Sequence, residues 1–458
     1  MKLVLLSGGS GKRLWPLSND ARSKQFLRVL QDDDMQMVSM VQRVWRQLEL
    51  SGLGAESYIA TGKSQIEMMQ SQVGTEVPLI VEPERRDTFP AIALAATYLY
   101  SVKSIGLNEV VAILPVDPYV ENHFFNVVQQ LEVAINHSGA HIGLIGVKPT
   151  YPSSKYGYII PGTSGQSHGE LEILQVQRFQ EKPTEEQAEL LISNGALWNC
   201  GVFAFKLDYI INKLQEKGLP IQYEELLKQY ANLPEISFDY EVLEKERETI
   251  VIPYEGYWKD LGTWNTLTEE MGSKQIGKGI VSLDCTNTHL INELDIPVVV
   301  LGVSDIVVAT SPDGILVTDK SASPRIKETI NFNTGPKYEE RQWGWCKTLD
   351  VQQYEDGNQV TTKRLHVISG KNLSYCLSRS CQEVWTIVRG SAEFIHNGNR
   401  MSIKAGNVLH IPAMTMHGLK AITDVEFIVV QSGPLIMEND LVELYTDWEE
   451  IEQHCVKI

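Results

Sequence analysis

The sequence predicts an α/β domain, then a short β-rich segment, then a small antiparallel β-barrel. Over residues 1–270, short apolar runs alternate with helical stretches, which is typical of a mostly parallel sheet flanked by helices. Residues 271–335 read as short strands with polar turns, and residues 336–458 as strand after strand between turn signals. Because 458 residues exceed what one hydrophobic core usually supports, we expect these segments to be separate domains.

Apolar runs and their spacing set the elements of the first domain. We expect strands at Lys2–Leu6, Ser57–Ala60, Leu79–Val81 and Val110–Leu114, and helices at Val38–Leu48, Pro90–Ser101 and Asn122–Ile135. Ligands of such sheets bind outside the carboxyl ends of the strands. The loop Gly8–Arg13 and the carboxylate of Asp117 each follow an expected strand, so we place both at the binding edge.

Turn chemistry predicts the two later segments. We expect strands at Ile280–Leu283, Val298–Val303, Ile306–Thr310 and Gly314–Val317. In the turn Ser311–Gly314, Pro312 presets φ and Gly314 tolerates positive φ. Beyond Arg341, turn signals at Asp356–Asn358, Ser369–Lys371, His396–Gly398 and Ala405–Asn407 favour a small barrel or jelly roll.

Composition excludes several classes of protein. Hydrophobic residues make up 43% and charged residues 21%, as in soluble globular proteins. The net charge of −18 argues against nonspecific nucleic-acid binding, which needs a basic surface. We find neither an apolar run that could span a membrane nor a signal-like segment, and the six cysteines form no CxxC pair. We therefore expect a cytoplasmic protein with reduced thiols that binds neither nucleic acid nor membranes.

The loop that follows the first expected strand is suited to phosphates. Its glycines Gly8, Gly9 and Gly11 let backbone N–H groups approach phosphate oxygens. Cations follow at Lys12, Arg13 and Lys24. The spacing matches neither the Walker pattern nor the dinucleotide GxGxxG pattern. We interpret it as a nucleotide-binding loop of another kind.

The stretch Gly8–Ser18, followed by Lys24–Phe26, resembles the signature of sugar-1-phosphate nucleotidyltransferases in the form found in mannose-1-phosphate guanylyltransferases. The resemblance implies a Rossmann-like, GT-A-like nucleotidyltransferase domain, a left-handed β-helix-like segment and a C-terminal cupin barrel. It also implies transfer of GMP from GTP to mannose 1-phosphate by direct in-line displacement with Mg²⁺. Arg13 would stabilise charge on the phosphates and the transition state, and Lys24 would hold the phosphates.

Two aspartates are candidate magnesium ligands. Asp117 lies in Leu114–Pro118, and Asp260 lies in Trp258–Trp264, which resembles a family segment. The alternatives are that Asp117 forms a turn or helix cap and that Asp260 caps the helix that follows. The family usually has histidine where this chain has Pro118.

The resemblance also implies residues for the base and the sugar. Glu82 or a backbone carbonyl could accept hydrogen bonds from guanine, although Asp87 and Phe89 depart from the family's pattern. The implied nucleotide-binding residues are Leu6, Ser7, Gly8, Gly9, Gly11, Lys12, Arg13, Glu82, Arg86, Thr88 and Pro115. The implied sugar-phosphate-binding residues are Gly157, Tyr158, Glu181, Lys182 and Asn199.

The C-terminal domain resembles a cupin that isomerises mannose 6-phosphate, but its metal ligands differ. The segment Ser378–Trp385 replaces a histidine-rich run and leaves Glu383 and His417 as matching ligands, with Cys381 as an alternative third. A catalytic zinc site usually takes three protein ligands. We therefore expect a degenerate cupin that is retained for packing, assembly or regulation.

Three other functions stay open at this stage. The sugar could be another hexose or heptose 1-phosphate, because hydroxyl-binding side chains do not reveal stereochemistry. A bifunctional transferase and isomerase would need metal at Glu383 and His417. A non-catalytic sensor of nucleotide sugars is the third, and a homodimer through the β-rich segments is an open alternative to a monomer.

Overall fold

A computed structural model describes residues 1–9, 13–19, 21–168, 171–330, 335–434 and 440–455. The chain forms two compact units. The first comprises Met1–Leu14 and Ser23–Gly272, and the second comprises Trp15–Arg22 and Ser273–Ile458. The second unit thus includes a short stretch of the N-terminal signature as well as the β-rich segment and the C-terminal domain. Over the described residues, the structure contains no helix long and apolar enough to cross a membrane.

A nine-stranded sheet forms the centre of the first unit, in the order β5-β4-β1-β6-β11-β8-β12-β10-β9. Its strands are β1 (Lys2–Ser7), β4 (Ser57–Gly62), β5 (Leu79–Glu82), β6 (Val110–Pro115), β8 (Ile142–Val147), β9 (Tyr158–His168), β10 (Leu171–Gln180), β11 (Leu197–Lys206) and β12 (Thr249–Tyr254).

The expectation of a mostly parallel sheet is wrong for the second half of this sheet. The strands β5, β4, β1 and β6 are parallel, as is the pair β8 and β12, whereas β11 runs antiparallel to β6 and β8. The antiparallel pairings begin with β11, which enters the sheet between β6 and β8. Only two residues separate β9 from β10, so these strands pair as a hairpin instead of crossing over.

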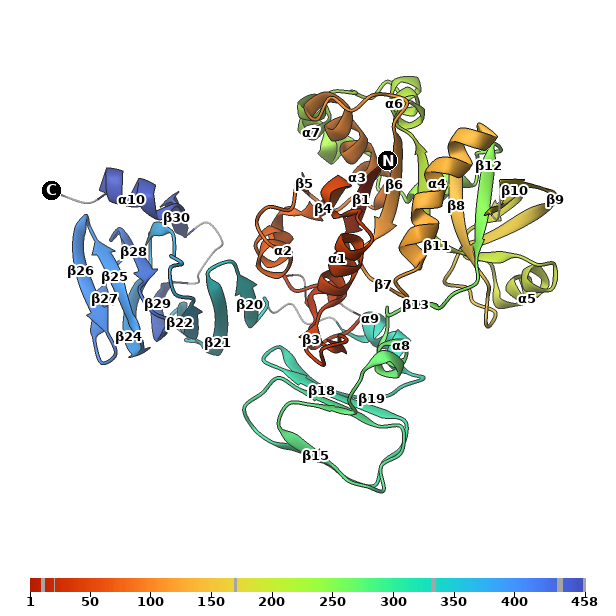
Figure 1. Ribbon diagram of the computed structural model, residues 1–458. Helices are drawn as coiled ribbons and strands as arrows, with labels where there is room; N and C mark the ends of the chain where they lie inside the picture. The colour runs from red at the N-terminus through yellow and green to blue at the C-terminus, as the bar shows by residue number, and fades with distance from the viewer. Residues whose placement is uncertain (10–12, 20, 169–170, 331–334, 435–439, 456–458) are drawn as a thin grey trace. The chain divides into compact units, whose positions relative to one another are not determined.

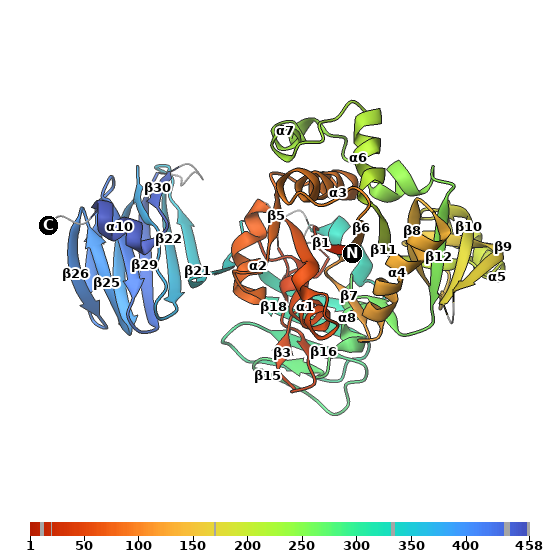
Figure 2. The same ribbon diagram turned by 45° about the horizontal axis from the view of Figure 1, so that its top comes forward.

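Helices cover both faces of the sheet (Figures 1 and 2). The helices of this unit are α1 (Met40–Leu50), α2 (Ile66–Val73), α3 (Thr88–Thr97), α4 (Phe124–Ser138), α5 (Glu185–Ser193), α6 (Leu207–Glu216), α7 (Tyr223–Lys228) and α8 (Trp264–Glu270). Alternate side chains of β1 are therefore buried on opposite sides. Leu3 and Leu5 pack with α1, α2 and α4, and Val4 packs with α3, α6 and α7.

The β-rich segment of the second unit stacks short parallel strands. One ladder joins β14 (Gln275–Ile276), β16 (His289–Asn292) and β18 (Ile306–Ser311), and a second joins β15 (Gly279–Val281) and β17 (Val298–Val300). Successive coils of chain thus lie side by side, as in a β-solenoid. The final strand, β19 (Gly314–Asp319), turns back on β18 as a hairpin.

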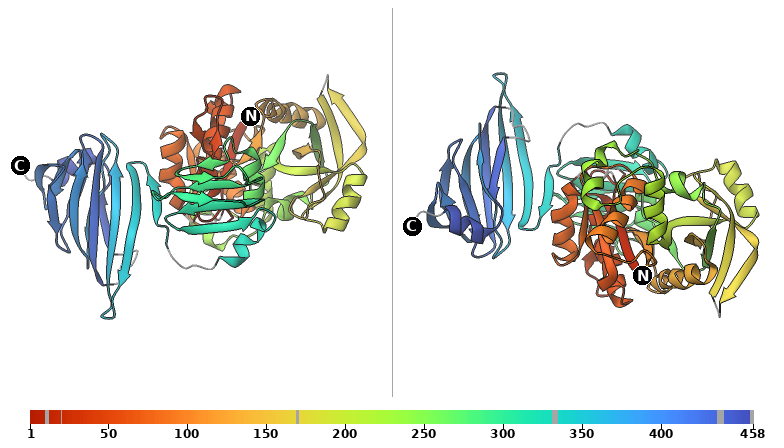
Figure 3. Two further views of the ribbon diagram at one scale, coloured as in Figure 1. Left: turned by 90° about the horizontal axis from the view of Figure 1, so that it is seen from below. Right: turned by 90° about the horizontal axis from the view of Figure 1, so that it is seen from above.

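The C-terminal domain consists of two antiparallel sheets, which Figure 3 shows as stacked layers of strands. One sheet contains β20 (Tyr338–Arg341), β21 (Gly344–Gln353), β22 (Asn358–Val367), β24 (Gln382–Arg389), β27 (Val408–Ile411) and β29 (Val425–Pro434). The other contains β23 (Tyr375–Ser378), β25 (Ser391–His396), β26 (Asn399–Lys404), β28 (His417–Ala421) and β30 (Leu441–Tyr445). Aromatic side chains such as Trp385, Phe394 and Phe427 fill the space between the sheets, which agrees with the expected β-barrel of cupin type.

Candidate active site

Two adjoining cavities lie at the edge of the central sheet where β1 and β6 end. The larger cavity has a volume of about 550 Å³, and the smaller one has a volume of about 270 Å³. They share Pro115 and Asp117. The predicted residues that line the larger cavity are Leu6, Ser7, Gly8, Gly9, Glu82, Arg86, Thr88, Pro115 and Asp117. The predicted residues that line the smaller cavity are Lys24, Pro115, Asp117, Asn199 and Asp260.

The charged centre of the smaller cavity is one lysine between two aspartates. Lys24 Nζ lies 2.7 Å from Asp117 Oδ2 and 3.2 Å from Asp260 Oδ1. Burial disfavours the charged ammonium, but the two carboxylates outweigh that effect and raise the pKa of Lys24. The ammonium stays charged, and the cluster carries one net negative charge.

Strand pairing brings the two aspartates together although 143 positions separate them in the chain. The short strand β7 (Pro118–Val120) begins directly after Asp117 and pairs antiparallel with β13 (Trp258–Asp260). In this register Asp260 lies opposite Pro118. Asp117 itself follows β6 at the carboxyl edge of the sheet, so both carboxylates reach the same point.

Buried amides hold the start of the glycine-rich loop. The Gln25 amide donates to Ser7 Oγ at 3.1 Å, and the Gln65 amide donates to Ser23 Oγ at 2.7 Å. Ser23 Oγ in turn donates to the carbonyl of Gly9 at 3.2 Å. This network fixes the loop from its inner side and leaves its outer side open to the larger cavity. The predicted residues Gly11 and Lys12 lie outside the described residues.

Arg13 is exposed and acts electrostatically on the smaller cavity. Burial raises the pKa of Tyr156, the charge of Asp260 adds to this effect, and the charge of Arg13 opposes it. Tyr156 lines the smaller cavity beside Trp258. Arg13 therefore supplies a positive potential at this end of the site.

The far wall of the larger cavity contains a buried carboxyl group. The Tyr230 hydroxyl donates to Glu82 Oε2 at 2.8 Å, and burial raises the pKa of Glu82. Arg86 donates to the carbonyl of Leu233 at 2.7 Å. Thr88 Oγ1 accepts from the backbone N–H of Phe238 at 2.8 Å, so its side chain also anchors the start of α3.

The residues predicted for the sugar phosphate come together at the start of β9. A Cβ atom on Gly157 would lie 2.5 Å from Glu181 Oε2, so only glycine fits there without displacing that carboxylate. The Gly157 carbonyl accepts from the backbone N–H of Asn199 at 2.8 Å. Glu181 Oε1 lies 2.7 Å from Lys182 Nζ, and Glu181 Oε2 is buried without a hydrogen-bond partner. The Tyr158 side chain is fully buried and bonds to Ser153, so only its backbone is available to a ligand.

Sequence analysis missed Asp239, which lines the larger cavity beside Phe203. The Asn199 amide donates to Asp239 Oδ1 at 2.8 Å. Burial, together with the charge of Glu181, raises the pKa of Asp239 to about 7. It begins a short π-helical turn, Asp239–Leu243, and only the acidic pair in Phe238–Glu241 could have signalled it.

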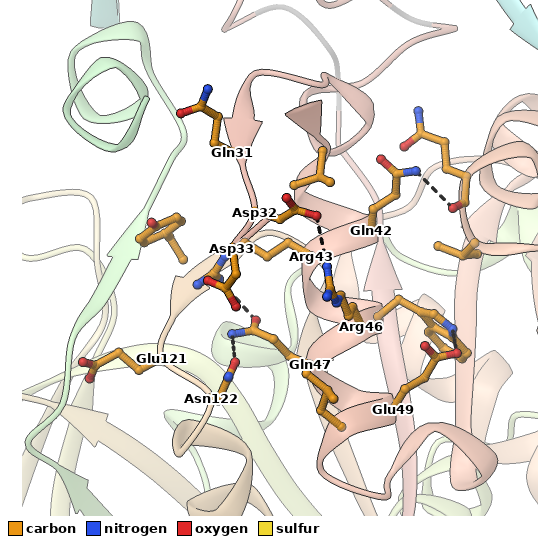
Figure 4. A pocket seen from close by; sticks show the side chains of 16 residues that line it. Gln31, Asp32, Asp33, Gln42, Arg43, Arg46, Gln47, Glu49, Glu121 and Asn122 are labelled. Atoms are coloured by element: carbon orange, nitrogen blue, oxygen red, sulfur yellow. Dashed lines mark hydrogen bonds and ion pairs between the residues drawn. The ribbon is translucent and has the colours of Figure 1, made fainter. Parts of the chain in front are cut away.

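A separate cavity of about 680 Å³ lies beside α1, where the structure places no sequence-predicted site residue that it describes (Figure 4). Its polar side chains bind one another: Arg46 Nη1 lies 3.0 Å from Asp32 Oδ2, and the Gln47 amide donates to Asn122 Oδ1 at 2.9 Å. Because these side chains already bind one another, they are less available for hydrogen bonds or ion pairs with a ligand.

The C-terminal domain keeps two of the expected ligands close together. His417 Nε2 lies 3.9 Å from Glu383 Oε2, which accepts from the indole N–H of Trp385 at 2.7 Å. His417 Nδ1 lies 3.0 Å from the carbonyl of Thr415. Among the described side chains, no group of three or more His, Cys, Asp and Glu residues could hold a metal ion. The cysteines with described side chains are unpaired.

Together, the mixed sheet, the glycine-rich loop after its first strand and the Lys24–Asp117–Asp260 cluster define a Rossmann-like α/β enzyme of the nucleotidyltransferase class. The family described as nucleotidyl transferase matches residues 2–275, and the family described as mannose-6-phosphate isomerase C-terminal matches residues 336–446. Since the first match covers more than half of the chain, this protein belongs to the nucleotidyl transferase family.

Two relatives match almost the whole chain, and one solved structure matches most of it. The xanthan biosynthesis protein XanB of Xanthomonas campestris pv. campestris (strain B100) is 29% identical over 96% of this chain and 97% of its own. A putative mannose-1-phosphate guanylyltransferase of Vibrio cholerae is also 29% identical, over 96% and 98%. A crystal structure described as mannose-1-phosphate geranyltransferase from Thermus thermophilus is 28% identical, with a TM-score of 0.59, and covers 72% of this chain and 97% of that one.

Proposed function

We propose that the protein transfers GMP from GTP to mannose 1-phosphate, giving GDP-mannose and pyrophosphate. The observation that carries the proposal is the Lys24–Asp117–Asp260 cluster beside the larger cavity. The names of the relatives support the choice of substrates. Because nucleoside triphosphates are cytoplasmic metabolites, we also propose a cytoplasmic location.

The donor set fits a magnesium ion. Mg²⁺ prefers one or two carboxylates together with phosphate oxygens, and Asp117 and Asp260 converge on a single cationic group. When bound, Mg²⁺ would neutralise phosphate charge and polarise the phosphorus–oxygen bonds. Asp117 and Asp260 would hold it, and Lys24 would turn from them to a phosphate oxygen.

The chain's own residues would supply positioning and charge. A phosphate oxygen of the sugar 1-phosphate attacks the α-phosphorus of GTP, the bond to the β-phosphate breaks, and pyrophosphate leaves. Arg13 and Lys24 would stabilise the charge that builds up on the phosphates. Glu181 and Asn199 would hold the sugar, and Glu82, if ionised, would accept from guanine N–H groups.

The first test is magnesium-dependent release of pyrophosphate by the purified protein. GTP, ATP, UTP and dTTP are each paired with mannose, glucose and galactose 1-phosphate. We expect release with GTP and mannose 1-phosphate only. Another preferred pair would overturn the choice of substrates, and release without magnesium would overturn the metal's role.

A second function, isomerisation of mannose 6-phosphate, is suggested by the family match at residues 336–446. We propose that this chain lacks it, because Glu383 and His417 are two ligands where three are usual.

A further inference from the structure

The signature loop leaves the first unit between the two cations proposed for catalysis. Arg13 and Lys24 belong to the first unit, whereas Trp15–Arg22 belongs to the second. This stretch packs on the β-rich segment. The chain therefore passes through the second unit on its way from one catalytic cation to the other.

The turn Ser311–Gly314, which joins β18 to β19, holds this stretch. The Ser311 hydroxyl donates to the carbonyl of Pro16 at 2.6 Å, and the Asn19 amide donates to Asp313 Oδ2 at 2.6 Å. Ser311 is buried. A Cβ atom on Gly314 would lie 2.4 Å from the ring of Trp15, so the turn and the stretch are in close contact.

A buried arginine holds the end of the stretch that precedes Lys24. Arg22 is 7% exposed, and its Nη2 lies 2.6 Å from Glu293 Oε1. Its Nε donates to the carbonyl of Leu17 at 3.0 Å, which locks the turn of the stretch itself. The Tyr338 ring lies 5.2 Å from the guanidinium carbon, within the range of a cation–π contact.

Asp313 also joins this anchor to the C-terminal domain. Its Oδ1 accepts from the backbone N–H of Lys337 at 2.6 Å, directly before β20 begins at Tyr338. One carboxylate thus binds the signature stretch through one oxygen and the entry of the C-terminal domain through the other.

We infer that Asp313 is a positioning residue of the transferase: the Ser311–Gly314 turn fixes the conformation of Trp15–Arg22, and thereby the spacing of the two ends of this stretch, which lead in the chain to Arg13 and Lys24. The inference rests on the proposed function for the roles of those two cations. A misplacement of about 1 Å can cost on the order of 100-fold in rate, so a contact remote from the phosphates can control turnover.

The test compares Asp313→Ala with wild type in the full-length protein, below the melting temperature of both. We expect kcat per folded molecule to fall about tenfold or more while KM for the sugar 1-phosphate is unchanged, because Glu181 and Asn199 are not attached to the stretch. Asp313→Asn keeps one acceptor oxygen and should lose less. A merely structural role would lower the melting temperature and leave kcat of the folded protein unchanged, and that outcome would overturn the inference.

Two further variants make the result specific. Asp295→Ala removes an exposed carboxylate of the same β-rich segment, 3.5 Å from Lys278, and should keep wild-type kcat. Asn19→Ala combined with Asp313→Ala should lose less than the sum of the two single losses, because each single variant breaks the contact between Asn19 and Asp313, while Asn19→Ala also removes the acceptor of the Ala21 and Arg22 N–H groups. Fully additive losses would count against the inference. If Asp313→Ala fails to fold, Asn19→Ala and Asp313→Asn decide the question. If the wild-type protein uses another substrate pair, the proposed choice of substrates is wrong. The effect of Asp313→Ala is then measured with that pair, so the inference is still tested.

Discussion

Lys24 occupies the position between Asp117 and Asp260 that a divalent cation would favour. With one ammonium and two carboxylates the cluster is still negative, so on the proposed mechanism the two carboxylates would hold a divalent cation. When phosphates are bound, Lys24 would contact a phosphate oxygen in place of the carboxylates. The same lysine would then serve both the empty and the substrate-bound site.

Replacement of Asp117 tests this exchange. Asp117→Asn removes the carboxylate closest to Lys24 Nζ and retains the shape of the side chain. We expect kcat to fall at least about 100-fold, the order of loss seen when a preorganised charged contact is removed, and the magnesium concentration for half-maximal rate to rise. Rates against magnesium concentration measure both effects.

The matched control is Asp34→Asn, because the Asp34 side chain is 71% exposed and lies in a surface turn. It should turn over as wild type does. A wild-type rate from Asp117→Asn would remove Asp117 from the site.

The carboxyl group of Asp239 should make the free energy of unfolding depend on pH, because it is buried beside Glu181. Burial and Glu181 raise its pKa to about 7, from an ordinary value of 3.8. The folded protein therefore holds this proton more tightly than the unfolded chain does. The contribution of this carboxyl group to the free energy of unfolding is largest below pH 4 and decreases as the pH rises towards 7.

Asp239→Asn should remove this dependence. The variant keeps an oxygen that can accept from Asn199 but carries no charge at any pH. The difference in free energy of unfolding between this variant and wild type should shift in favour of the variant by roughly 2–3 kcal/mol from pH 5 to pH 8. Urea denaturation at the two pH values measures the difference. Glu189→Gln, on the exposed face of α5, should show none, and an equal effect from both variants would contradict the assignment.

At the scale of elements, the sequence predicts the parts of the site that follow regular strands. The apolar runs of β1 and β6 place the glycine-rich loop and Asp117 at one edge, and the structure confirms these strands. The meeting of Asp117 with Asp260 depends on β7 and β13, which are three residues each and too short to show a hydrophobic period. The position of Asp239 in the cavity wall depends on a π-helical turn that has no recognisable sequence pattern. The role of Asp313 depends on its hydrogen bond with Asn19, which lies 294 positions away in the chain.

Gly157 tests whether the β9 entrance shapes the sugar side of the site. In Gly157→Ala the new methyl group would meet Glu181 Oε2 and the Phe179 ring, at 2.5 and 2.6 Å. Glu181 must move, so we expect KM for the sugar 1-phosphate to rise about tenfold while KM for GTP changes less than twofold, a loss of roughly 1.4 kcal/mol in binding. Initial rates with each substrate varied in turn give the two constants.

Gly106→Ala is the matched control, because a Cβ atom there meets nothing within 4 Å and its backbone does not require glycine. It should leave both KM values unchanged. Equal increases in both KM values for Gly157→Ala would indicate general disorder of the site instead of a displaced Glu181.

At the scale of the whole molecule, the chain has a net charge of −18. Cations gathered near one loop therefore stand out from the rest of the molecule and mark that loop as a candidate binding site for an anion. For the proposed polyanionic substrate, such a net charge is unfavourable overall, so the cations near the site, Arg13 and Lys24, would have to act together with a bound metal ion. The stretch Trp15–Arg22, which belongs to the second unit, joins the two cations in the chain. The entry of the C-terminal domain is thereby tied to the signature stretch through Asp313, whether or not that domain has chemistry of its own.

The Glu383–His417 pair decides whether the C-terminal domain has such chemistry. Both side chains are buried, and burial lowers the pKa of His417, so the imidazole is neutral at pH 7 and able to bind a metal. Glu383, however, already accepts from Trp385, and two protein ligands hold zinc weakly.

We expect the full-length protein, dialysed against zinc and then buffer, to retain well under one zinc per chain, and His417→Ala to keep transferase kcat within about twofold. His396→Ala, in the neighbouring strand β25, is the control for nonspecific packing loss. The opposite result would be one zinc per chain in the wild-type protein and in His396→Ala but not in His417→Ala, together with turnover of mannose 6-phosphate. That result would show that Glu383, His417 and a third ligand form a working isomerase.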